Sequence, residues 1–554
     1  MTEQQQTYPI AEAVRQAYRQ GEEDEAMEPR VLVGHGEAPV GRIGDGDYVI
    51  FYDIRGEREI ELTEAFTDPE FSHFPAAPIR THWATMIRYR ADLDVKVAFP
   101  PPESLPDTLA ECLSRAGRTQ TKVSESEKAI HASFFLNGKR SEPFEGETRV
   151  VVASPNTLHY DEVPEMSAQR VADAAIEAIG GQDDFLFVNF ANVDVLGHIE
   201  NREAILKALA TVDREAGRVI DAAREAGVTV LVTADHGTVE KWYYPDGTVD
   251  TGHTDSPVPL IVVDAALDGR TEGVLRDGGA LTDIAPTVLA LLGIEQPAAM
   301  TGTSLFAGDL PAHDRPRALL LLLDGWGAGD GGDGDLTAAA DTPGFDALRA
   351  RYPSTRLTAA GVAVGMPDGT VGNSECGHLH IGAGRVVASD RVCIERDIAD
   401  GSFRENEAFV WAMEGAKRDG RALHLMGIIS FYSSHGSVEH LLELVRMAHA
   451  RGVPEVYIHG MLGRRGERPE SGAIYCGQVE RECAALGTGR LVTIIGRFWS
   501  LDREANWDRI EKTYRVLVEG QGIPVPEAAP PGPSSRPSPL RERRGTSGKD
   551  DVPT

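Results

Sequence analysis

The sequence predicts an α/β protein with two domains. Its 554 residues exceed what one ordinary hydrophobic core accommodates. From residue 101 to 308, apolar strand-like runs alternate with amphipathic helical stretches, and a second series of the same kind begins after residue 389. Such alternation favours largely parallel, doubly wound sheets with helices on both faces.

One domain is expected over residues 101–308, continuing after a linker at 309–317 into 318–388. Short apolar runs indicate its strands, among them "TRVVVAS", "FLFVNFANVD", "VTVLVTADHG" and "VPLIVVDA". Longer amphipathic runs such as "SAQRVADAAIEAIG" indicate the helices between them. The run "LLLLLDGWGAG" at 319–329 adds a buried strand that ends in a glycine turn, and "PGFDALRARYP" supplies its crossover helix.

The other domain is expected to combine residues 389–522 with residues 1–100. Strand and helix patterns alternate in "ALHLMGIIS", "VEHLLELVRMAHARG", "EVYIHGML", "LVTIIGRFW" and "NWDRIEKTYRVLVEG". The first hundred residues carry further strand candidates in "RVLVG", "DYVIFYDI" and "VKVAF". Residues 523–554 are rich in Pro, Ser and charge, which predicts a disordered tail.

Composition narrows the function classes. A net charge of -31 leaves no basic stripe for nucleic acid, which argues against DNA or RNA as a partner. No apolar run is long enough for a membrane span. The five cysteines include no CxxC pair, so a reducing cytoplasm is the expected location.

Three apolar strands end in an aspartate, at Asp194, Asp235 and Asp324. Because the carboxyl ends of parallel strands share one crevice, these carboxylates should converge. Histidines accompany them: His198 lies one helical turn after Asp194, His236 follows Asp235, and His253 lies in the loop "DTGHTDSP". Each residue alone is more often a cap or a turn residue, but six together indicate a site for divalent ions such as Mn²⁺, Zn²⁺ or Mg²⁺.

Ser374 lies in the glycine-rich stretch "VGNSECGHLHIGAGR". Backbone N–H groups of such a turn can hold a phosphate, and a neighbouring dication can make the hydroxyl a nucleophile. Without the aspartates, the stretch would be read as an ordinary turn.

Taken together, several motifs resemble the cofactor-independent phosphoglycerate mutases of the alkaline-phosphatase superfamily: "DGWG", "MPDGTVGNSECGHLHIGAGR", "DFLFVNFANVDVLGH", "TADHG", "TGHTDSPVP", "SESEKAIHASFFLNG", "YDEVPEMSA" and "GGALTDIAPTVLALLGIEQPAAMTGTSL". The resemblance covers residues 8 to about 522. It implies an alkaline-phosphatase-like domain plus a transferase domain. It also implies an isomerase that interconverts 3- and 2-phosphoglycerate through phosphoserine, without 2,3-bisphosphoglycerate.

The order of the motifs differs from that of the family. There the "DGWG" strand opens the chain, whereas here the family's C-terminal portion occupies residues 8–308 and its N-terminal portion residues 317–522. The resemblance therefore implies a circularly permuted chain, and exposed connections tolerate such opening.

Residue by residue, the resemblance implies two Mn²⁺ sites. One would use Asp194, His198 and His253, and the other Asp235, His236, Asp324 and Ser374. Ser374 would accept the phosphoryl group while Lys128 neutralises developing charge.

The resemblance also implies a substrate side, in which a phosphorylated hydroxy acid would be held by Arg55, Arg58, His435, Arg465, Arg497 and Arg503. Two departures affect this side. The family's "SDGGVHSH" loop is here "SFYSSHGS", and Gly466 replaces the aspartate of "DGRD". Losing that carboxylate would cost on the order of 10² or more in rate.

The resemblance and its departures leave four functions open. The leading one is a Mn²⁺-dependent mutase that acts as a monomer. The second is a paralogue that transfers a phosphoryl or phosphonoformyl-like group to a glycerate-type acceptor, which Phe431, Tyr432 and Gly466 favour. The third is a metal-dependent phosphatase. The fourth is a pseudoenzyme, against which the seven intact metal positions argue.

Overall fold

The computed structural model describes residues 8–34, 36–77, 79–101, 104–157, 159–244, 246–431, 435–463 and 470–527. The chain forms two compact units, one from residues 101–403 and one from residues 1–100 together with 404–554. Residues 389–403, which the sequence suggested for the second domain, group with the unit 101–403.

The unit 101–403 is built on an eight-stranded sheet of order β10-β12-β9-β8-β11-β7-β5-β6. Its strands are β5 (Gln120–Glu125), β6 (Glu147–Val152), β7 (Phe185–Phe190), β8 (Thr229–Thr233), β9 (Val258–Val263), β10 (Gly279–Ala280), β11 (Ala318–Leu323) and β12 (Ser354–Thr358). The pairings from β8 through β11, β7 and β5 to β6 are all parallel, whereas β9 pairs antiparallel with both β8 and β12. The α/β prediction is confirmed for this unit.

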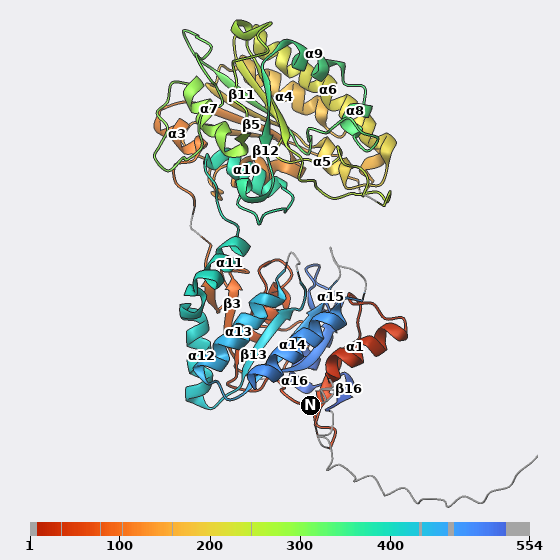
Figure 1. Cartoon of the computed structure of the whole chain (residues 1–554). Coiled ribbons are helices and arrows are strands. Elements are labelled where there is room, and N and C mark those ends of the chain that lie inside the picture. Colours follow the sequence, from red (N-terminus) through yellow and green to blue (C-terminus); the bar gives the residue numbers. More distant parts are fainter. Residues whose placement is uncertain are drawn as a thin grey trace, which may run out of the picture. The chain divides into compact units, whose positions relative to one another are not determined.

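Helices cover both faces of this sheet (Figure 1). The helices α4, α5, α6, α8 and α9 form one group, whereas α3, α7 and α10 form another. Their bounds are α3 (Leu109–Arg115), α4 (Ala168–Gly180), α5 (Asn192–Gly197), α6 (Arg202–Glu225), α7 (Ile284–Leu291), α8 (Leu336–Ala339), α9 (Pro343–Arg351) and α10 (Ser374–Ala383), with α11 (Asp390–Asp400) following. The leucines of β11 are at most 1% exposed, because a central strand covered on both sides has no wet face.

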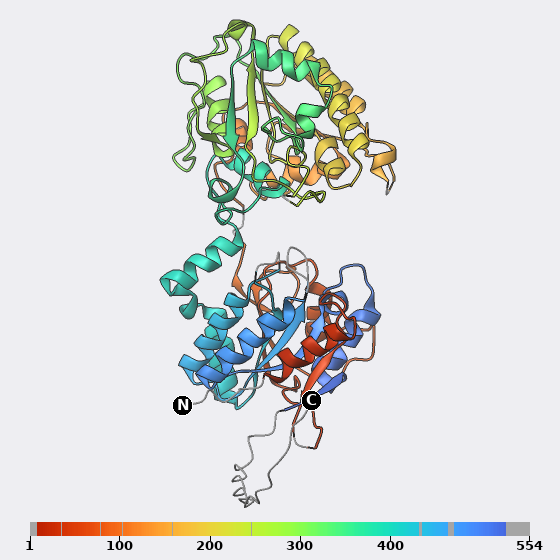
Figure 2. The same ribbon diagram turned by 45° about the vertical axis from the view of Figure 1, so that its right-hand side comes forward.

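The other unit has an eight-stranded sheet of order β16-β1-β15-β14-β13-β2-β3-β4. Its strands are β1 (Arg30–Val33), β2 (Tyr48–Phe51), β3 (His82–Ile87), β4 (Lys96–Phe99), β13 (Leu423–Ile428), β14 (Val456–Leu462), β15 (Arg490–Gly496) and β16 (Ile523–Pro526). Strands from the two ends of the sequence are interleaved in this sheet: β1 lies between β16 and β15, and β2 pairs with β13. Figure 2 shows the red and orange elements of the first hundred residues beside the blue C-terminal elements.

Two groups of helices pack on this second sheet. The helices α1, α14, α13 and α12 pack against one another in that order. On the other face α2 and α16 meet over a core that includes Phe51, Phe66 and Tyr514. Their bounds are α1 (Pro9–Arg19), α2 (Ile60–Thr67), α12 (Glu407–Asp419), α13 (Val438–Arg451), α14 (Gly472–Leu486), α15 (Arg497–Ser500) and α16 (Trp507–Glu519).

The start of the expected disordered tail is corrected by the structure. Residues 523–526 form β16, which pairs in parallel with β1, and Val525 is 6% exposed. Two prolines obscured this strand in the sequence, yet Pro524 and Pro526 are tolerated because β16 lies at the edge of the sheet. Residues 528–554 lie outside the described residues.

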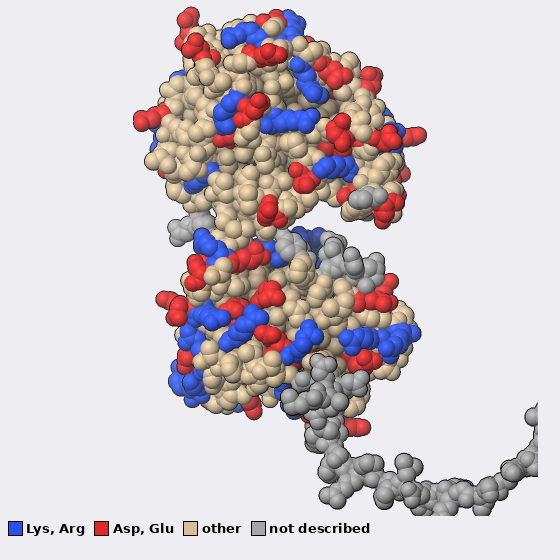
Figure 3. Space-filling model, viewed as in Figure 1, with Lys and Arg blue, Asp and Glu red and all other residues tan. Residues whose placement is uncertain are grey.

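The face shown in Figure 3 carries acidic and basic side chains without a continuous basic stripe. Asp and Glu side chains are interspersed with Lys and Arg on the face shown in Figure 3. Among the described residues, no helix has the length and apolar character needed to cross a membrane.

Candidate metal centre

The predicted aspartates converge at one edge of the sheet in the unit 101–403. The strands β8, β11 and β7 are direct neighbours, and their carboxyl ends lead into Asp235, Asp324 and Asp194 respectively. Asp235 and Asp324 are fully buried and Asp194 is 6% exposed. Neighbouring parallel strands therefore deliver three carboxylates to one place, as the sequence predicted.

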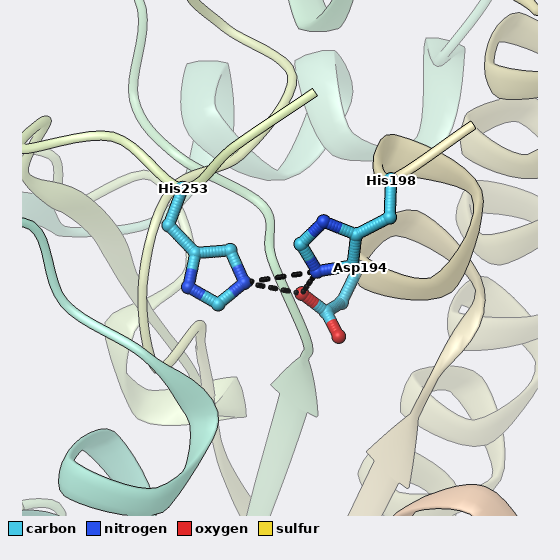
Figure 4. Close-up of side chains that lie close together, drawn as sticks. All are labelled: Asp194, His198 and His253. Carbon is cyan, nitrogen blue, oxygen red and sulfur yellow. Dashed lines mark hydrogen bonds and ion pairs between the residues drawn. The ribbon is translucent and has the colours of Figure 1, made fainter. Parts of the chain in front are cut away.

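Asp194, His198 and His253 form the first cluster (Figure 4). The Nε2 atom of His253 lies 3.1 Å from Asp194 Oδ1 and 3.1 Å from His198 Nε2, and His198 Nε2 lies 3.4 Å from the same carboxylate oxygen. The spacing of four residues brings Asp194 and His198 together, because α5 turns once between them.

The Nδ1 atoms of both histidines face backbone carbonyls. His198 Nδ1 lies 2.8 Å from Thr251 O, and His253 Nδ1 lies 3.0 Å from Gly372 O. A carbonyl can only accept, so each Nδ1 carries a hydrogen, and each ring in its neutral form presents a lone pair at Nε2. Two lone pairs and a carboxylate oxygen thus converge, an arrangement that fits a divalent cation with borderline ligand preference.

Ser374 lies at the centre of a second cluster. Its Oγ is 2.7 Å from Lys128 Nζ, 3.0 Å from His236 Nε2 and 3.3 Å from Asp324 Oδ1. Among the described residues, Asp324 Oδ2 is buried without a hydrogen-bond partner, and the buried Asp235 Oδ2 has the His378 Nδ1 atom 3.1 Å away. Buried carboxylate oxygens of this kind need a compensating charge, so this donor set also fits a cation.

The local backbone presents Ser374 at the start of α10. Asn373 caps this helix, and its side chain accepts a hydrogen bond from Cys376 N. Gly377 lets the helix approach the metal centre, because a Cβ there would lie 2.6 Å from Asp235 O. The hydroxyl therefore sits at a helix N-terminus, where N–H groups and the helix dipole favour a phosphate.

Lys128 balances the buried carboxylates. Its Nζ lies 2.6 Å from Asp194 Oδ2 and 2.7 Å from Asp324 Oδ1. Burial opposes its charge, but Asp194, Asp324 and Asp235 raise the pKa of the Lys128 ammonium above its ordinary value. Burial likewise opposes ionisation of Asp194, yet Lys128 and the histidines hold the pKa of Asp194 well below its ordinary value.

His236 carries an additional proton when no cation is present. Burial disfavours the imidazolium, but the charge of Asp235 and contacts with Asp324 raise the pKa of His236 to about 9. A cation at this cluster has to displace that proton, since a ligating imidazole nitrogen needs its lone pair.

The structure also locates the residues expected on the substrate side. Arg55 and Arg503 both pair with Glu57, at 2.6 and 2.5 Å, and Arg58 donates to Leu501 O at 3.0 Å. Arg497 Nη2 lies 3.3 Å from His435 Nε2. All five predicted residues that are described belong to the unit 1–100 and 404–554. Arg465, Gly466 and Tyr432 lie outside the described residues.

Sequence reasoning missed two buried carboxyls on this side, Asp53 and Glu59. Both are fully buried, and they cluster with His435. The sequence signal was weak, because "DIRGERE" reads as a charged surface turn. The strand-end rule that located Asp194, Asp235 and Asp324 could have identified Asp53, which closely follows β2.

Family comparisons agree with the fold and with the converging ligands. A model described as the metalloenzyme superfamily matches residues 17–296, which is more than half of the chain, and a model described as the BPG-independent PGAM N-terminus matches residues 394–530. The chain belongs to the metalloenzyme superfamily. The model that describes the N-terminus of the BPG-independent PGAM family therefore matches a segment that lies C-terminal to the superfamily match in this chain.

Curated relatives are named 2,3-bisphosphoglycerate-independent phosphoglycerate mutases. The protein of Syntrophotalea carbinolica is 45% identical over 53% of this chain and 57% of its own length. The protein of Pseudomonas aeruginosa is 42% identical over 53% and 56%, and that of Listeria monocytogenes 41% over 53% and 57%. The matched region thus spans little more than half the length of these relatives.

Among solved structures, phosphoglycerate mutase of Leishmania mexicana at low cobalt concentration is similar over 50% of this chain and 53% of its own, with 31% identity and a TM-score of 0.39.

Proposed function

We propose that this protein is a Mn²⁺-dependent phosphotransferase that interconverts 3- and 2-phosphoglycerate through a phosphoserine at Ser374. The observation that carries the proposal is the placement of Ser374 Oγ within 3.3 Å of Lys128, His236 and Asp324, beside the lone pairs of His198 and His253. The names of the curated relatives support the same substrate class.

Two cation sites are proposed from this geometry. Asp194, His198 and His253 would hold one ion, and Asp235, His236, Asp324 and Ser374 the other. Bound divalent ions would supply Lewis-acid polarisation of the phosphoryl group and would favour the ionised Ser374 hydroxyl. Mixed carboxylate and imidazole ligands support Mn²⁺ as the metal.

The protein's own groups have separate roles in the transfer. Ser374 Oγ would attack phosphorus, and the N-terminal N–H groups of α10 would receive the phosphoryl oxygens. The Lys128 ammonium, already 2.7 Å from Ser374 Oγ, would offset the charge that builds up on those oxygens. The acid group would be bound by bidentate arginine donors, with His435 beside them: Arg55, Arg58, Arg465, Arg497 and Arg503.

We further propose that the chain is a circular permutant acting in the cytoplasm as a monomer without 2,3-bisphosphoglycerate. The order of the two family matches and the position of "DGWG" after the middle of the chain support the permutation. All five cysteines are free, which suits a reducing compartment.

An enolase-coupled assay tests the mutase proposal. With 3-phosphoglycerate and Mn²⁺, and without bisphosphoglycerate, the wild type should form 2-phosphoglycerate, and Ser374→Ala should reduce the rate by at least about 10³-fold. Ser389→Ala is the matched control, because it alters another serine at the start of a helix, α11. A Ser374→Ala protein that retains the wild-type rate would refute the phosphoserine route.

Gly466 favours a second candidate, a paralogue with a different acceptor or transferred group. It replaces the carboxylate that the resemblance places beside the glycerate hydroxyls, so we expect a slow mutase reaction. ³¹P NMR of mixtures with 3-phosphoglycerate and glycerate separates the outcomes. Phosphoserine on Ser374 without 2-phosphoglycerate would support the paralogue, and release of inorganic phosphate alone would support a phosphatase.

A further inference from the structure

A second cluster of titratable groups lies in the unit 1–100 and 404–554, outside the metal centre. Asp53, Glu59 and His435 are each fully buried, and one ligand atom of each lies within 4.8 Å of the others. His435 Nδ1 lies 2.6 Å from Glu59 Oε1. On the other side of the ring, His435 Nε2 lies 3.3 Å from Arg497 Nη2.

The fold places this cluster at strand ends of the second sheet. Asp53 follows β2, His435 lies between β13 and α13, Arg497 follows β15, and Glu59 caps the start of α2. Asp53 Oδ1 accepts a hydrogen bond from Ile428 N at 2.8 Å. Only glycine fits at position 427, because a Cβ there would lie 2.5 Å from Asp53 Oδ1. The backbone thus accommodates a buried carboxylate at this position.

The contacts of His435 with Arg497 and Glu59 indicate its tautomer. An arginine can only donate, so His435 Nε2 accepts from Arg497 and presents its lone pair there. Nδ1 must then carry the hydrogen and donate it to Glu59. A carboxyl group that accepts the Nδ1 hydrogen of an imidazole fixes the tautomer and orientation of the ring, as it does for general bases in enzymes.

The surrounding charges favour a proton rather than a metal ion at this cluster. His435 faces Asp53 and Glu59 but also the charges of Arg55, Arg58 and Arg497. Burial raises the pKa of Glu59 to about 8, and burial together with the Glu59 charge raises the pKa of Asp53. Asp53 Oδ2 is buried without a hydrogen-bond partner among the described residues. A proton held between the two carboxyls accounts for both observations.

We propose that Asp53, Glu59 and His435 form a proton-transfer triad, in which Glu59 positions His435 so that Nε2 exchanges a proton with a hydroxyl of a hydroxy acid bound by Arg497. This inference rests on the proposed phosphotransferase function. It assigns Glu59 and Asp53 a role that replaces, at another position, the carboxylate lost at Gly466.

The proton balance closes within one turnover. The hydroxy acid takes over the N–H of Arg497, which frees the lone pair of His435 Nε2. The substrate hydroxyl that is to receive the phosphoryl group gives its proton to Nε2, and its electron pair later forms the new O–P bond. Nε2 passes that proton to the substrate oxygen whose O–P bond has broken. The serine oxygen that carried the phosphoryl group keeps the electron pair of its own broken O–P bond, so the serine and the neutral ring end as they began.

Three substitutions at full chain length test the role of Glu59. Glu59→Gln keeps the shape and an acceptor for His435 Nδ1 but can neither ionise nor share a proton with Asp53, whereas Glu59→Asp keeps a titratable carboxyl group. We expect Glu59→Gln to lower kcat for 3-phosphoglycerate isomerisation about 100-fold with KM within about threefold, and Glu59→Asp to recover part of the loss. Glu61→Gln, on the same helix, is the matched control and should keep the wild-type rate. A Glu59→Gln protein with the wild-type kcat would overturn the proposal.

A second measurement does not depend on turnover. In ¹⁵N-histidine-labelled protein, the His435 signals are assigned by their loss in His435→Gln. We expect Nε2 to show the shift of an unprotonated nitrogen, and to move towards the protonated shift when 3-phosphoglycerate or glycerate is added. The move should be absent in Glu59→Gln. Melting temperatures of all variants should agree within a few degrees.

The two measurements separate the inference from the proposed function. If the wild type makes no 2-phosphoglycerate but the His435 signal still responds to glycerate through Glu59, the mutase proposal fails and the triad stands. If Nε2 proves to be protonated without ligand, or if Mn²⁺ specifically broadens the His435 signals, the triad is wrong.

Discussion

Lys128 holds together the buried carboxylates of the metal-free centre, because its ammonium contacts Asp194, Asp324 and Ser374 at 2.6–2.7 Å. Removing one partner of a buried ion pair leaves uncompensated charge. We expect Lys128→Met to lower the free energy of unfolding of the metal-free protein by about 3–5 kcal/mol. The loss should be smaller with Mn²⁺, whose charge replaces that of the ammonium.

Thermal and denaturant unfolding, with and without Mn²⁺, measure this effect. Lys207→Met is the control, because Lys207 pairs with Glu165 at the surface, and its loss should change stability by at most about 1 kcal/mol. Equal losses for the two variants without metal would contradict the proposed role of Lys128 in the buried cluster.

The protonation of His236 predicts how metal affinity depends on pH. Its pKa rises from 6.5 to about 9, so below about pH 9 the metal-free protein carries a proton that the cation must displace. Affinity should therefore rise with pH by up to about tenfold per unit between pH 6.5 and 9, and level off above that. Mn²⁺ titration calorimetry in buffers of different ionisation enthalpy counts the released protons. An affinity that is independent of pH would contradict the assignment.

At the residue scale, the sequence predicted the metal-binding half of the candidate site better than the substrate half. Asp194, Asp235 and Asp324 end long apolar strands, so their convergence follows from sheet geometry alone. Glu59 directly precedes the short helix α2 and follows a charged turn, and the residues around it in the sequence do not indicate that it is buried. Its partner His435 is 376 residues away, so the contact depends on long-range packing.

A hydrogen-bonded chain links three neighbouring strands of the second sheet. Asp47 Oδ2 accepts from His424 Nε2 at 3.2 Å, His424 Nδ1 lies 2.9 Å from His459 Nε2, and His459 Nδ1 lies 2.8 Å from Thr493 Oγ1. The carboxylate of Asp47 accepts from His424 Nε2, and the buried Nδ1 of His459 is paired with the Thr493 hydroxyl. Burial lowers the pKa of His459, which keeps this ring neutral.

Thr493→Val should therefore leave the buried His459 Nδ1 without its hydrogen-bond partner. We expect a loss of about 1–3 kcal/mol in the free energy of unfolding. Thr488→Val is the matched control, because Thr488 also contacts a histidine, His449, but at an exposed position. Denaturant unfolding should show little change for this control. Comparable losses of stability in both variants would show that the loss does not depend on burial of the hydrogen-bonded residues.

At the element scale, the sequence predicted most central strands, because β11, β8 and β13 are apolar runs buried on both faces. It did not predict β3, β5, β10, β12 or β16. Polar and aromatic residues interrupt the apolar pattern in "HWATMI", and two prolines do so in "IPVP". These strands are recognised only once their sheet partners are known.

At the scale of the whole molecule, the two compact units differ in how the chain builds them. Residues 101–403 are continuous and contain a complete eight-stranded sheet and the metal centre. We expect this fragment to unfold cooperatively on its own and to bind Mn²⁺. Residues 404–527 alone lack β1–β4 and should fail to fold, whereas co-expression with residues 1–100 should recover a soluble complex.

Circular dichroism and calorimetry of the purified fragments test this expectation. A cooperative transition for residues 404–527 alone would contradict it, because the strands β13 and β15 would then be stable without β2 and β1.

The interleaving of the second sheet also affects how the protein is made. The ribosome releases β1–β4 first, but their neighbours β13 and β15 emerge only after some three hundred further residues. During that interval the nascent chain presents apolar strands with open edges, a state that invites wrong pairing. Translation in a reconstituted system should therefore show yields that depend on holdase chaperones such as trigger factor.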